Sequence, residues 1–428
     1  MNMLNRQILP NPLQDRILAI AKQAKQAARE ISRCSTEIKN RALVAMADAL
    51  LSHTESLLAE NAKDVTEARK KNLATPFIER LTLTPGRISE MAAGFREVAS
   101  LSDPVGEIIG LTRRPNGMQV GRMRVPIGLI GIIYESRPNV TADVAALCLK
   151  SGNAVLLRGG SEALHSNRAI VGILQGIASS FGIPAGAISF VNETHREAIS
   201  ILLHLEGLID LVIPRGGAEL MKLVTEESRV PVIRHDRGLC HTFVDASAEL
   251  ALAVSICCNA KVQRPAVCNA METLLVHQEI APRFLPELAK HLEQAGCLLR
   301  GCPKTCKILP TIAAATEADW TTEYLDLILA IKIVDDLDEA MAHISRYGSQ
   351  HSEAMITRDH NHAMRFLNEV DASAVFVNAS TRLNDGFQLG LGAEMGISTS
   401  RIHARGPMGL EALTCTKFIV LGNGQIRE

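Results

Sequence analysis

A cysteine between a helix-like run and a strand-like run is the first residue of this chain that could do chemistry. Cys268 follows a run of helical character over residues 251–259 and the helix-breaking Pro265, and it precedes an apolar run over residues 273–276. Flanking backbone amides and the positive charge of Arg264 would favour its thiolate, which is the form that attacks carbon. One cysteine among ten is more often a buried apolar residue, so this segment predicts a nucleophile only together with its surroundings.

Asn139 is a second candidate, because it follows an apolar run and lies in a loop stiffened by Pro138. Loops at the carboxyl ends of parallel strands are where doubly wound sheets build their sites. A side-chain amide in such a loop can donate to an oxyanion that develops on a thiol-bound carbon. The alternative is a turn asparagine that satisfies its own backbone.

Two glycine-containing turns have the residue types that bind phosphate. Glycine lets the backbone approach a phosphate closely, and arginine can hold one through two hydrogen bonds. An ordinary turn from a strand to a helix is the alternative for each. The residues are Arg158, Gly159, Gly160 and Ser161 in the first turn and Pro214, Arg215, Gly216 and Gly217 in the second.

The elements that must position these residues alternate between strands and helices. Residues 13–71 have the spacing of amphipathic helices, and Pro115-Asn116-Gly117 predicts a hairpin turn. From Gly128 onward, short apolar runs alternate with helix-length segments, which predicts the α/β class with a parallel, doubly wound sheet. The predicted strands are 129–133, 154–157, 187–191, 209–213, 230–233, 242–244, 273–276, 330–334, 374–377 and 418–421.

Composition limits the class of protein further. A chain of 428 residues, 47% of them apolar, predicts two or three domains with sizeable cores. A net charge of −1 with scattered basic residues argues against a nucleic-acid partner, and no apolar run reaches the roughly 18 residues of a membrane helix. The N-terminus lacks the pattern of a secretory signal, and ten irregularly spaced cysteines do not form a disulfide framework. Cys302 and Cys306 lack a second ligand pair, so we predict no metal site. The missing signal and the irregular cysteines together predict a cytoplasmic location.

Five segments together resemble a known family. In order, they read YESRPNVT at 134–141, LRGGSE at 157–162, IPRGG at 213–217, QRPAVCNAMET at 263–273 and HARGPMGLE at 403–411. Their order and spacing resemble those of the gamma-glutamyl phosphate reductase branch of the aldehyde dehydrogenase superfamily, whose members are also called glutamate-5-semialdehyde dehydrogenases. The resemblance covers essentially the whole chain.

The resemblance implies an aldehyde-dehydrogenase-like α/β fold with three parts. Residues 1–116 and 134–241 would form a doubly wound cofactor-binding domain, and residues 242–378 an α/β catalytic domain that carries the nucleophilic cysteine. A β-hairpin at 117–133 and the tail at 379–428 would form an oligomerisation flap. An ordinary surface hairpin is the alternative, but exposed strand edges invite pairing, so we favour a homo-oligomer.

The implied activity is the NADPH-dependent reduction of L-glutamyl 5-phosphate to L-glutamate 5-semialdehyde and phosphate through a cysteine thioester. This is the second step of proline biosynthesis from glutamate. By the family pattern, Cys268 is the nucleophile, and Asn139 forms the oxyanion hole with the backbone N–H of Cys268. Arg158 stands where aldehyde dehydrogenases place a lysine near the adenosine ribose, which favours NADP over NAD. Glu323 matches the glutamate that holds the nicotinamide ribose, and Gly216 belongs to the turn that faces the pyrophosphate.

The contacts to the substrate are less defined by the sequence. Arg137 and Arg405 are candidates for binding the substrate carboxylate, and Glu135 is a candidate for binding the amine. The same resemblance raises a transient contact with glutamate 5-kinase as an expectation. Subunit number cannot be derived from the sequence.

One family residue is missing. Hydrolytic aldehyde dehydrogenases carry a Glu-Leu-Gly-Gly segment whose glutamate activates water, whereas residues 234–241 here read RHDRGLCH. Phosphate is already nucleophilic, so an enzyme that exchanges its acyl group with phosphate needs no such base. The charged residues Arg234 to Arg237 also depart from the reductase branch, while Cys240 and His241 are interpreted as structural. Two alternatives remain open: an acylating dehydrogenase for coenzyme A or another acyl phosphate, and a nucleotide-binding scaffold without catalysis.

Overall fold

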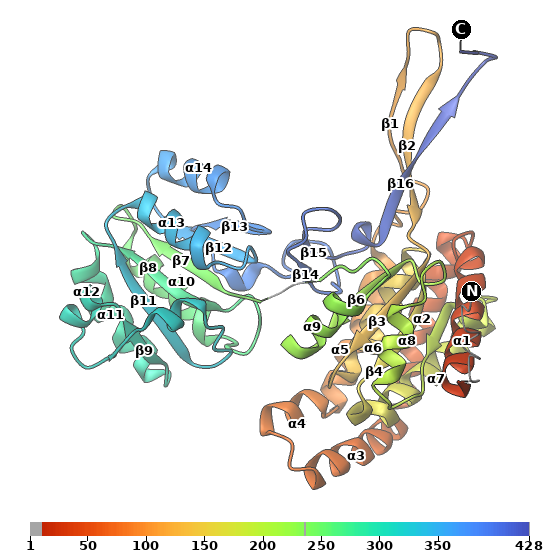
Figure 1. Cartoon of the computed structure of the whole chain (residues 1–428), viewed down its shortest axis with the longest axis horizontal. Coiled ribbons are helices and arrows are strands. Elements are labelled where there is room, and N and C mark those ends of the chain that lie inside the picture. Colours follow the sequence, from red (N-terminus) through yellow and green to blue (C-terminus); the bar gives the residue numbers. More distant parts are fainter. Residues whose placement is uncertain (1–10, 235–236, 428) are drawn as a thin grey trace, which may run out of the picture. The chain divides into compact units, whose positions relative to one another are not determined.

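The computed structural model describes residues 11–234 and 237–427, and its chain divides into two compact units (Figure 1). The first unit contains residues 1–234, 391–396 and 408–428, and the second contains residues 235–390 and 397–407. The chain therefore returns twice to the first unit after it has built most of the second.

Helices make up the N-terminal part of the first unit. Side chains cap three of them: Asn11 accepts from backbone amides at the start of α1, Ser35 does so for α2 and Thr84 for α5. Apolar residues at spacings of three and four, such as Leu43, Met46 and Leu50, are buried, as the sequence predicts. The helices are α1 (Pro12–Ile31), α2 (Thr36–Ser52), α3 (Thr54–Lys70), α4 (Thr75–Leu81) and α5 (Pro85–Ser100).

A parallel sheet of four strands follows in the first unit, in the order β5-β4-β3-β6. The strands are β3 (Leu129–Tyr134), β4 (Ala154–Gly159), β5 (Ile188–Phe190) and β6 (Leu211–Arg215). They alternate with α6 (Pro138–Lys150), α7 (Leu164–Ser180), α8 (Glu197–Leu203) and α9 (Ala218–Glu227). The chain winds outward from β3 to β5 and then crosses back to place β6 on the other side of β3. In sheets of this kind, the carboxyl ends of the strands where the winding reverses form the ligand site.

One predicted strand of this unit is wrong. Residues 230–233 form no strand, and only Val232 makes an isolated bridge, to Val212. Pro231 has no N–H to donate to a neighbouring strand, although its carbonyl accepts from Val212. The segment therefore makes a single bridge to β6 and does not extend into a strand.

An antiparallel sheet of three strands projects from the first unit (Figure 1). It consists of β1 (Ile108–Arg113), β2 (Gln119–Pro126) and β16 (Thr414–Leu421), with β2 in the middle. The hairpin predicted at Asn116-Gly117 is confirmed, since Gly117 has φ +89° and the Asn116 side chain accepts from the backbone of Met118. Strand β3, which the predicted flap range 117–133 includes, pairs in the parallel sheet instead.

The second unit is built on a parallel sheet of seven strands in the order β10-β9-β11-β8-β7-β12-β13. The strands are β7 (Cys240–Val244), β8 (Met271–His277), β9 (Leu298–Gly301), β10 (Ala313–Ala314), β11 (Ile328–Val334), β12 (Ser352–Ile356) and β13 (Ala374–Val377). Its helices are α10 (Leu250–Val262), α11 (Ala281–Gln294), α12 (Pro303–Ile308), α13 (Leu337–Tyr347) and α14 (His360–Glu369).

Helices cover both faces of this seven-stranded sheet. Neighbouring residues on one strand belong to different cores: Val244 packs with residues of α10 and α11, whereas Phe243 packs with residues of α13 and α14. Two separate cores on opposite faces are the mark of a doubly wound sheet, so the predicted fold class is confirmed.

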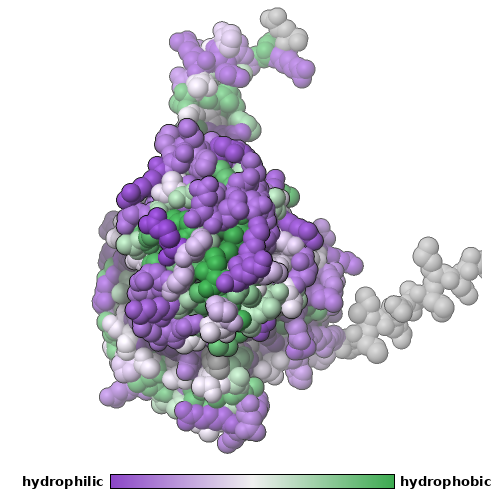
Figure 2. Space-filling view, turned by 90° about the vertical axis from the view of Figure 1, so that its left-hand side faces the viewer, coloured by the Kyte–Doolittle hydropathy of each residue, from purple (hydrophilic) through white to green (hydrophobic). Residues whose placement is uncertain are grey.

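Figure 2 looks onto the second unit and shows hydrophilic residues over most of that face, with a smaller apolar area among them. In the part of the chain that the structure describes, no single helix is long and apolar enough to cross a membrane.

Candidate active site

Cys268 lies in the second unit, in the irregular segment that joins α10 to β8. Helix α10 ends at Val262, and Pro265 follows in the connecting segment, as the sequence predicts. The backbone turns at the cysteine, because the amide of Ala270 donates to the carbonyl of Val267 over 3.1 Å. The Cys268 side chain is half-buried, so a small substrate can reach a thiol whose surroundings are otherwise packed.

The start of β7 supports the backbone of Cys268. The thiol of Cys240 donates to the Cys268 carbonyl oxygen over 3.1 Å, and burial raises the pKa of this thiol well above its ordinary value. Gly238 packs so closely that a Cβ at this position would overlap the backbone of Cys268. Cys240 therefore acts through its protonated form as a donor, in agreement with its interpretation as structural.

Glu323 binds the glycine that packs against Cys268. Its carboxylate accepts from the backbone N–H of Gly238 over 2.9 Å, and burial raises its pKa. The sequence prediction that Glu323 belongs to the site thus has a geometric counterpart: Glu323 holds Gly238, and Gly238 contacts Cys268. His235 and Asp236, which the sequence analysis noted in the adjoining segment, lie outside the described residues.

A buried ion pair holds the two elements on either side of the cysteine. Lys261 near the end of α10 and Glu272 in β8 are both buried, and their charged atoms are 2.6 Å apart. Burial raises the pKa of Glu272 to about 7, although Lys261 acts in the opposite direction. Glu272 also accepts from the backbone of Leu325 over 3.1 Å. The pair fixes where the segment carrying Cys268 begins and ends.

The sequence analysis missed Arg382. This residue lies in a short 3-10 helix after β13, and its guanidinium donates to the side chains of Gln263, over 2.9 Å, and of Asn269. Asn269 is buried and follows Cys268 directly. The signal in the sequence is an arginine just after a predicted strand, at 374–377, but nothing local shows that it reaches Asn269, 113 positions earlier.

In the first unit, the strand ends at the winding reversal carry the predicted cofactor turn. Glu135, just after β3, accepts from the backbone N–H of Gly217 over 2.8 Å, and its own N–H donates to the carbonyl of Arg215. Gly216 lies so close to the Glu135 carboxylate that a Cβ would collide with it. The turn therefore brings the backbone at the start of α9 to the end of β3, where a dinucleotide phosphate is bound in folds of this kind.

Arg158 ends β4 and is only 6% exposed. Its guanidinium donates to the carbonyls of Thr194 and His195 over 3.3 and 3.4 Å, and burial lowers its pKa. Its Nε is buried and has no partner among the described residues. A buried donor without a partner is costly, so this arginine suits an anionic ligand group that would complete its hydrogen bonds.

Asn139 is exposed in the first turn of α6 and donates to the carboxylate of Asp143 over 3.2 Å. Burial raises the pKa of Asp143 to about 6. Arg137 stands at the N-cap position of the same helix, where its side chain makes no capping hydrogen bond. In the second unit, Arg405 is paired with Asp371 over 2.7 Å, so its guanidinium already has a carboxylate partner within the protein.

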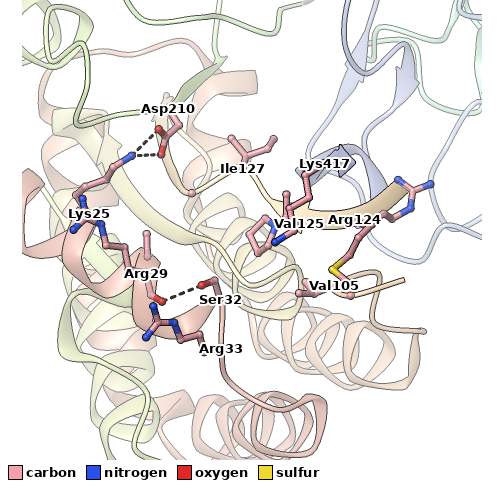
Figure 3. Close-up of a pocket in the computed structure, with 15 residues that line it drawn as sticks. Lys25, Arg29, Ser32, Arg33, Val105, Arg124, Val125, Ile127, Asp210 and Lys417 are labelled. Atoms are coloured by element: carbon pink, nitrogen blue, oxygen red, sulfur yellow. Dashed lines mark hydrogen bonds and ion pairs between the residues drawn. The ribbon is translucent and has the colours of Figure 1, made fainter. Parts of the chain in front are cut away.

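A cavity of about 700 Å³ in the first unit is lined by Arg29, Arg33 and Lys417 and by Asp210, which is paired with Lys25 (Figure 3). It lies beside Gly128 and Asp210, which precede β3 and β6. These are the amino ends of the strands, opposite to the ends that carry Glu135 and Arg215. The cavity is therefore separate from the cofactor turns.

Comparison with known proteins identifies the class. The sequence model of the aldehyde dehydrogenase family matches residues 10–297. The chain belongs to this family, and the resemblance seen in the sequence is confirmed.

The similar proteins also place it within the family. The gamma-glutamyl phosphate reductase of Thermodesulfovibrio yellowstonii is 58% identical over 96% of this chain and 99% of its own length. The crystal structure of gamma-glutamyl phosphate reductase from Thermotoga maritima is 47% identical, covers 96% of this chain and 100% of its own, and has a TM-score of 0.94. An acetylating aldehyde dehydrogenase from Geobacillus thermoglucosidasius shares the fold at 18% identity and a TM-score of 0.71. Within the family, the chain falls among the gamma-glutamyl phosphate reductases.

Proposed function

We propose that this protein reduces L-glutamyl 5-phosphate to L-glutamate 5-semialdehyde and phosphate, with NADPH as the reductant. The observation that carries the proposal is the match, over nearly the whole length of both chains, to relatives named gamma-glutamyl phosphate reductase. The geometry around Cys268 agrees with it, because this residue is half-buried, its backbone packs against Gly238, and its side chain interacts electrostatically with the cation of Arg382.

The residues of the chain have defined tasks in this reaction. The Cys268 thiolate attacks the acyl carbon and forms a carbon–sulfur bond, and phosphate leaves with the electron pair of the broken carbon–oxygen bond. The backbone N–H of Cys268 and the side-chain amide of Asn139 stabilise the negative charge on the former carbonyl oxygen. NADPH, when bound, supplies the hydride that converts the acyl group to an aldehyde. The carbon–sulfur bond then breaks, which frees the Cys268 thiolate and releases the semialdehyde.

The residues that would hold the cofactor lie at the carboxyl ends of the first unit's strands. We assign the pyrophosphate to the turn formed by Pro214, Arg215, Gly216 and Gly217, and the adenosine ribose to the turn formed by Arg158, Gly159, Gly160 and Ser161. Arg158 supports the choice of NADP, because its unpartnered Nε can donate to a ribose 2′-phosphate. Glu323 would hold the nicotinamide ribose.

The same proposal includes the substrate contacts, the cellular location and the partners of the enzyme. We assign Arg137 and Arg405 to the substrate carboxylate and Glu135 to its amine, and we place the enzyme in the cytoplasm. The projecting sheet would join copies of the chain into a homo-oligomer, and glutamate 5-kinase would be a transient partner. The cofactor domain, the catalytic domain and the flap would share these tasks, with β3 in the sheet of the cofactor domain and not in the flap.

The test uses the reverse reaction with phosphate rigorously removed. No glutamate stands where hydrolytic relatives keep their water-activating base, so the acyl-enzyme formed from semialdehyde and NADP should survive in water. NADPH absorbance should rise by about one equivalent per site and then stop. Adding phosphate or arsenate should restore continuous turnover.

Sustained turnover without phosphate would contradict the proposal and indicate a hydrolytic aldehyde dehydrogenase. Restoration by coenzyme A but not by phosphate would indicate the acylating alternative. Absence of any burst would indicate the non-catalytic scaffold.

A further inference from the structure

The guanidinium of Arg382 spans the segment that carries the nucleophile. Its Nε donates to Gln263 over 2.9 Å at the beginning of the segment, and its Nη1 donates to the side chain of Asn269 at the end. Cys268 lies between these two anchor points.

The anchors are themselves fixed. Asn269 is buried, and its side-chain amide donates to the backbone carbonyl of Asn384 over 2.9 Å. Its backbone carbonyl accepts from the hydroxyl of Thr381 over 2.7 Å. Arg382 therefore holds the cysteine segment through two hydrogen bonds, to Gln263 and Asn269, and two more join Asn269 to residues 381 and 384. The position of this cation relative to the segment is set before any ligand arrives.

Part of the Arg382 guanidinium makes no hydrogen bond to the described residues. Nε and Nη1 have partners, but Nη2 donates to no described residue. The side chain is half-buried, and Nη2 is not among the buried polar atoms without a partner in the described residues, so it is open to solvent or to a ligand. A planar group with free donors matches the oxygens of a phosphate, which it can bind through two hydrogen bonds.

The charges around Arg382 agree with an anion site. Burial and the nearby Arg264 lower the pKa of Arg382, while Asp385, Cys268 and Cys240 act in the opposite direction. The positive charge of Arg264, which is exposed, is therefore near enough to act on that of Arg382. Like charges held close together are relieved by binding an anion.

We propose that Arg382 binds the phosphate group of the acyl phosphate as Cys268 attacks it. This inference rests on the proposed function. In the reductive direction, Arg382 stabilises the charge that develops on phosphate while the carbon–oxygen bond breaks and the carbon–sulfur bond forms. In the reverse direction, it holds the attacking phosphate, whose oxygen bonds to the acyl carbon while the sulfur leaves as thiolate.

The experiment separates phosphate binding from formation of the acyl-enzyme. With semialdehyde and NADP, the burst in phosphate-free buffer measures acyl-enzyme formation alone, and the later steady state measures attack by phosphate. In Arg382→Gln, the burst should keep its amplitude, with a rate within about threefold of wild type. The phosphate concentration for half-maximal turnover should rise about 10- to 100-fold, as expected for a charge-assisted hydrogen bond.

Matched variants exclude a purely structural role. Arg382→Lys keeps the charge but loses the planar guanidinium that can bind phosphate through two hydrogen bonds. Its half-saturating phosphate concentration should therefore fall between those of wild type and Arg382→Gln. Arg346→Gln removes an exposed arginine of the same unit, which is paired with Glu317, and should change neither the burst nor phosphate saturation. The pH dependence of iodoacetamide alkylation of Cys268 reports the thiolate independently of phosphate.

Two results would overturn the inference. Unchanged phosphate saturation in Arg382→Gln, with wild type still dependent on phosphate, would remove Arg382 from phosphate binding and leave the proposed function intact. Equal loss of the burst in Arg382→Gln and Arg382→Lys, with folding retained by circular dichroism, would make Arg382 a positioning residue for Cys268. If wild type itself turns over without phosphate, the proposed function fails first.

Discussion

At the scale of single residues, the sequence identified what is chemically unusual locally and missed what depends on distant contacts. Cys268 was predicted as the nucleophile because its segment resembles that of the family, and the structure places it between α10 and β8, as the local pattern indicated. Glu323 was predicted from its resemblance to the family, and the structure adds the reason for its position, the hydrogen bond to Gly238. Arg382 could not be predicted, because only the folded chain brings it to Asn269.

The nucleophile gives the first residue-scale prediction. Cys268→Ala should abolish reduction while NADPH binding and the fold remain, because no second described cysteine shares this packed and half-buried turn. Cys268→Ser should be nearly as poor, since an alkoxide is much harder to form than a thiolate near neutral pH. Activity and cofactor titration measure the two effects. Retention of a tenth of the activity in the alanine variant would exclude the covalent mechanism.

Cofactor choice depends on Arg158. Arg158→Ala should weaken NADPH binding by about 1.5–3 kcal/mol, because a charge-assisted hydrogen bond to the 2′-phosphate is lost. NADH, which lacks this phosphate, should bind almost as before, although the carbonyls of Thr194 and His195 lose a donor in both cases. Fluorescence titration with each cofactor provides the comparison. Equal losses would show that Arg158 does not discriminate between them.

At the scale of elements, periodicity predicted most strands, and the exceptions have physical causes. Strands β9 and β12 were missed because Leu298–Gly301 is short and Ser352–Ile356 begins with two polar residues. In β12, Glu353 is buried only because His241 of the neighbouring strand donates to it. The false strand at 230–233 contains a proline whose missing N–H the apolar pattern does not reveal.

The ion pair between α10 and β8 gives an element-scale prediction with a pH dependence. Lys261→Met leaves the buried Glu272 without its cation, which should destabilise the protein by about 3 kcal/mol above pH 8. The pKa of Glu272 is raised from its ordinary value to about 7 in the folded protein, so its protonated form is favoured there. Protonated Glu272 therefore contributes stability at low pH, and this contribution is lost as pH rises through 7. The variant should consequently be closer to wild type at pH 6.

Urea unfolding at pH 6 and pH 8.5 measures this difference. The control is Lys70→Met, which breaks an exposed pair with Glu67 and should leave the free energy of unfolding close to that of wild type at either pH. An equal cost of Lys261→Met at both values of pH would show that Glu272 is not the group responsible.

At the scale of the whole molecule, the parallel, doubly wound class followed from the alternation of strands and helices, but the path of the tail did not. Residues 391–396 and 408–428 return to the first unit, while residues 397–407 belong to the second. The first crossing follows Gly390 in irregular backbone, and the later ones lie beside β14 (Ile397–Ser398) and β15 (Gly406–Pro407), two-residue strands that are too short to show a periodic pattern. The tail ends in β16, which completes the projecting sheet by pairing with β2 over the full length of both strands.

The projecting sheet gives the prediction that concerns assembly. It exposes large apolar side chains, among them Phe418 at 69% and Val420 at 54%, and its outer strands β1 and β16 each pair only with β2 in the described chain. Exposed apolar edges of this kind are stable in solution when another chain covers them. We therefore expect the double variant Phe418→Asp and Val420→Asp to sediment at the monomer mass of 46.3 kDa, whereas wild type sediments as an oligomer. Leu298→Asp, at a 65% exposed position in β9 of the other unit, is the matched control and should leave the wild-type mass unchanged. A double variant that keeps the wild-type mass would show that the flap does not join the subunits.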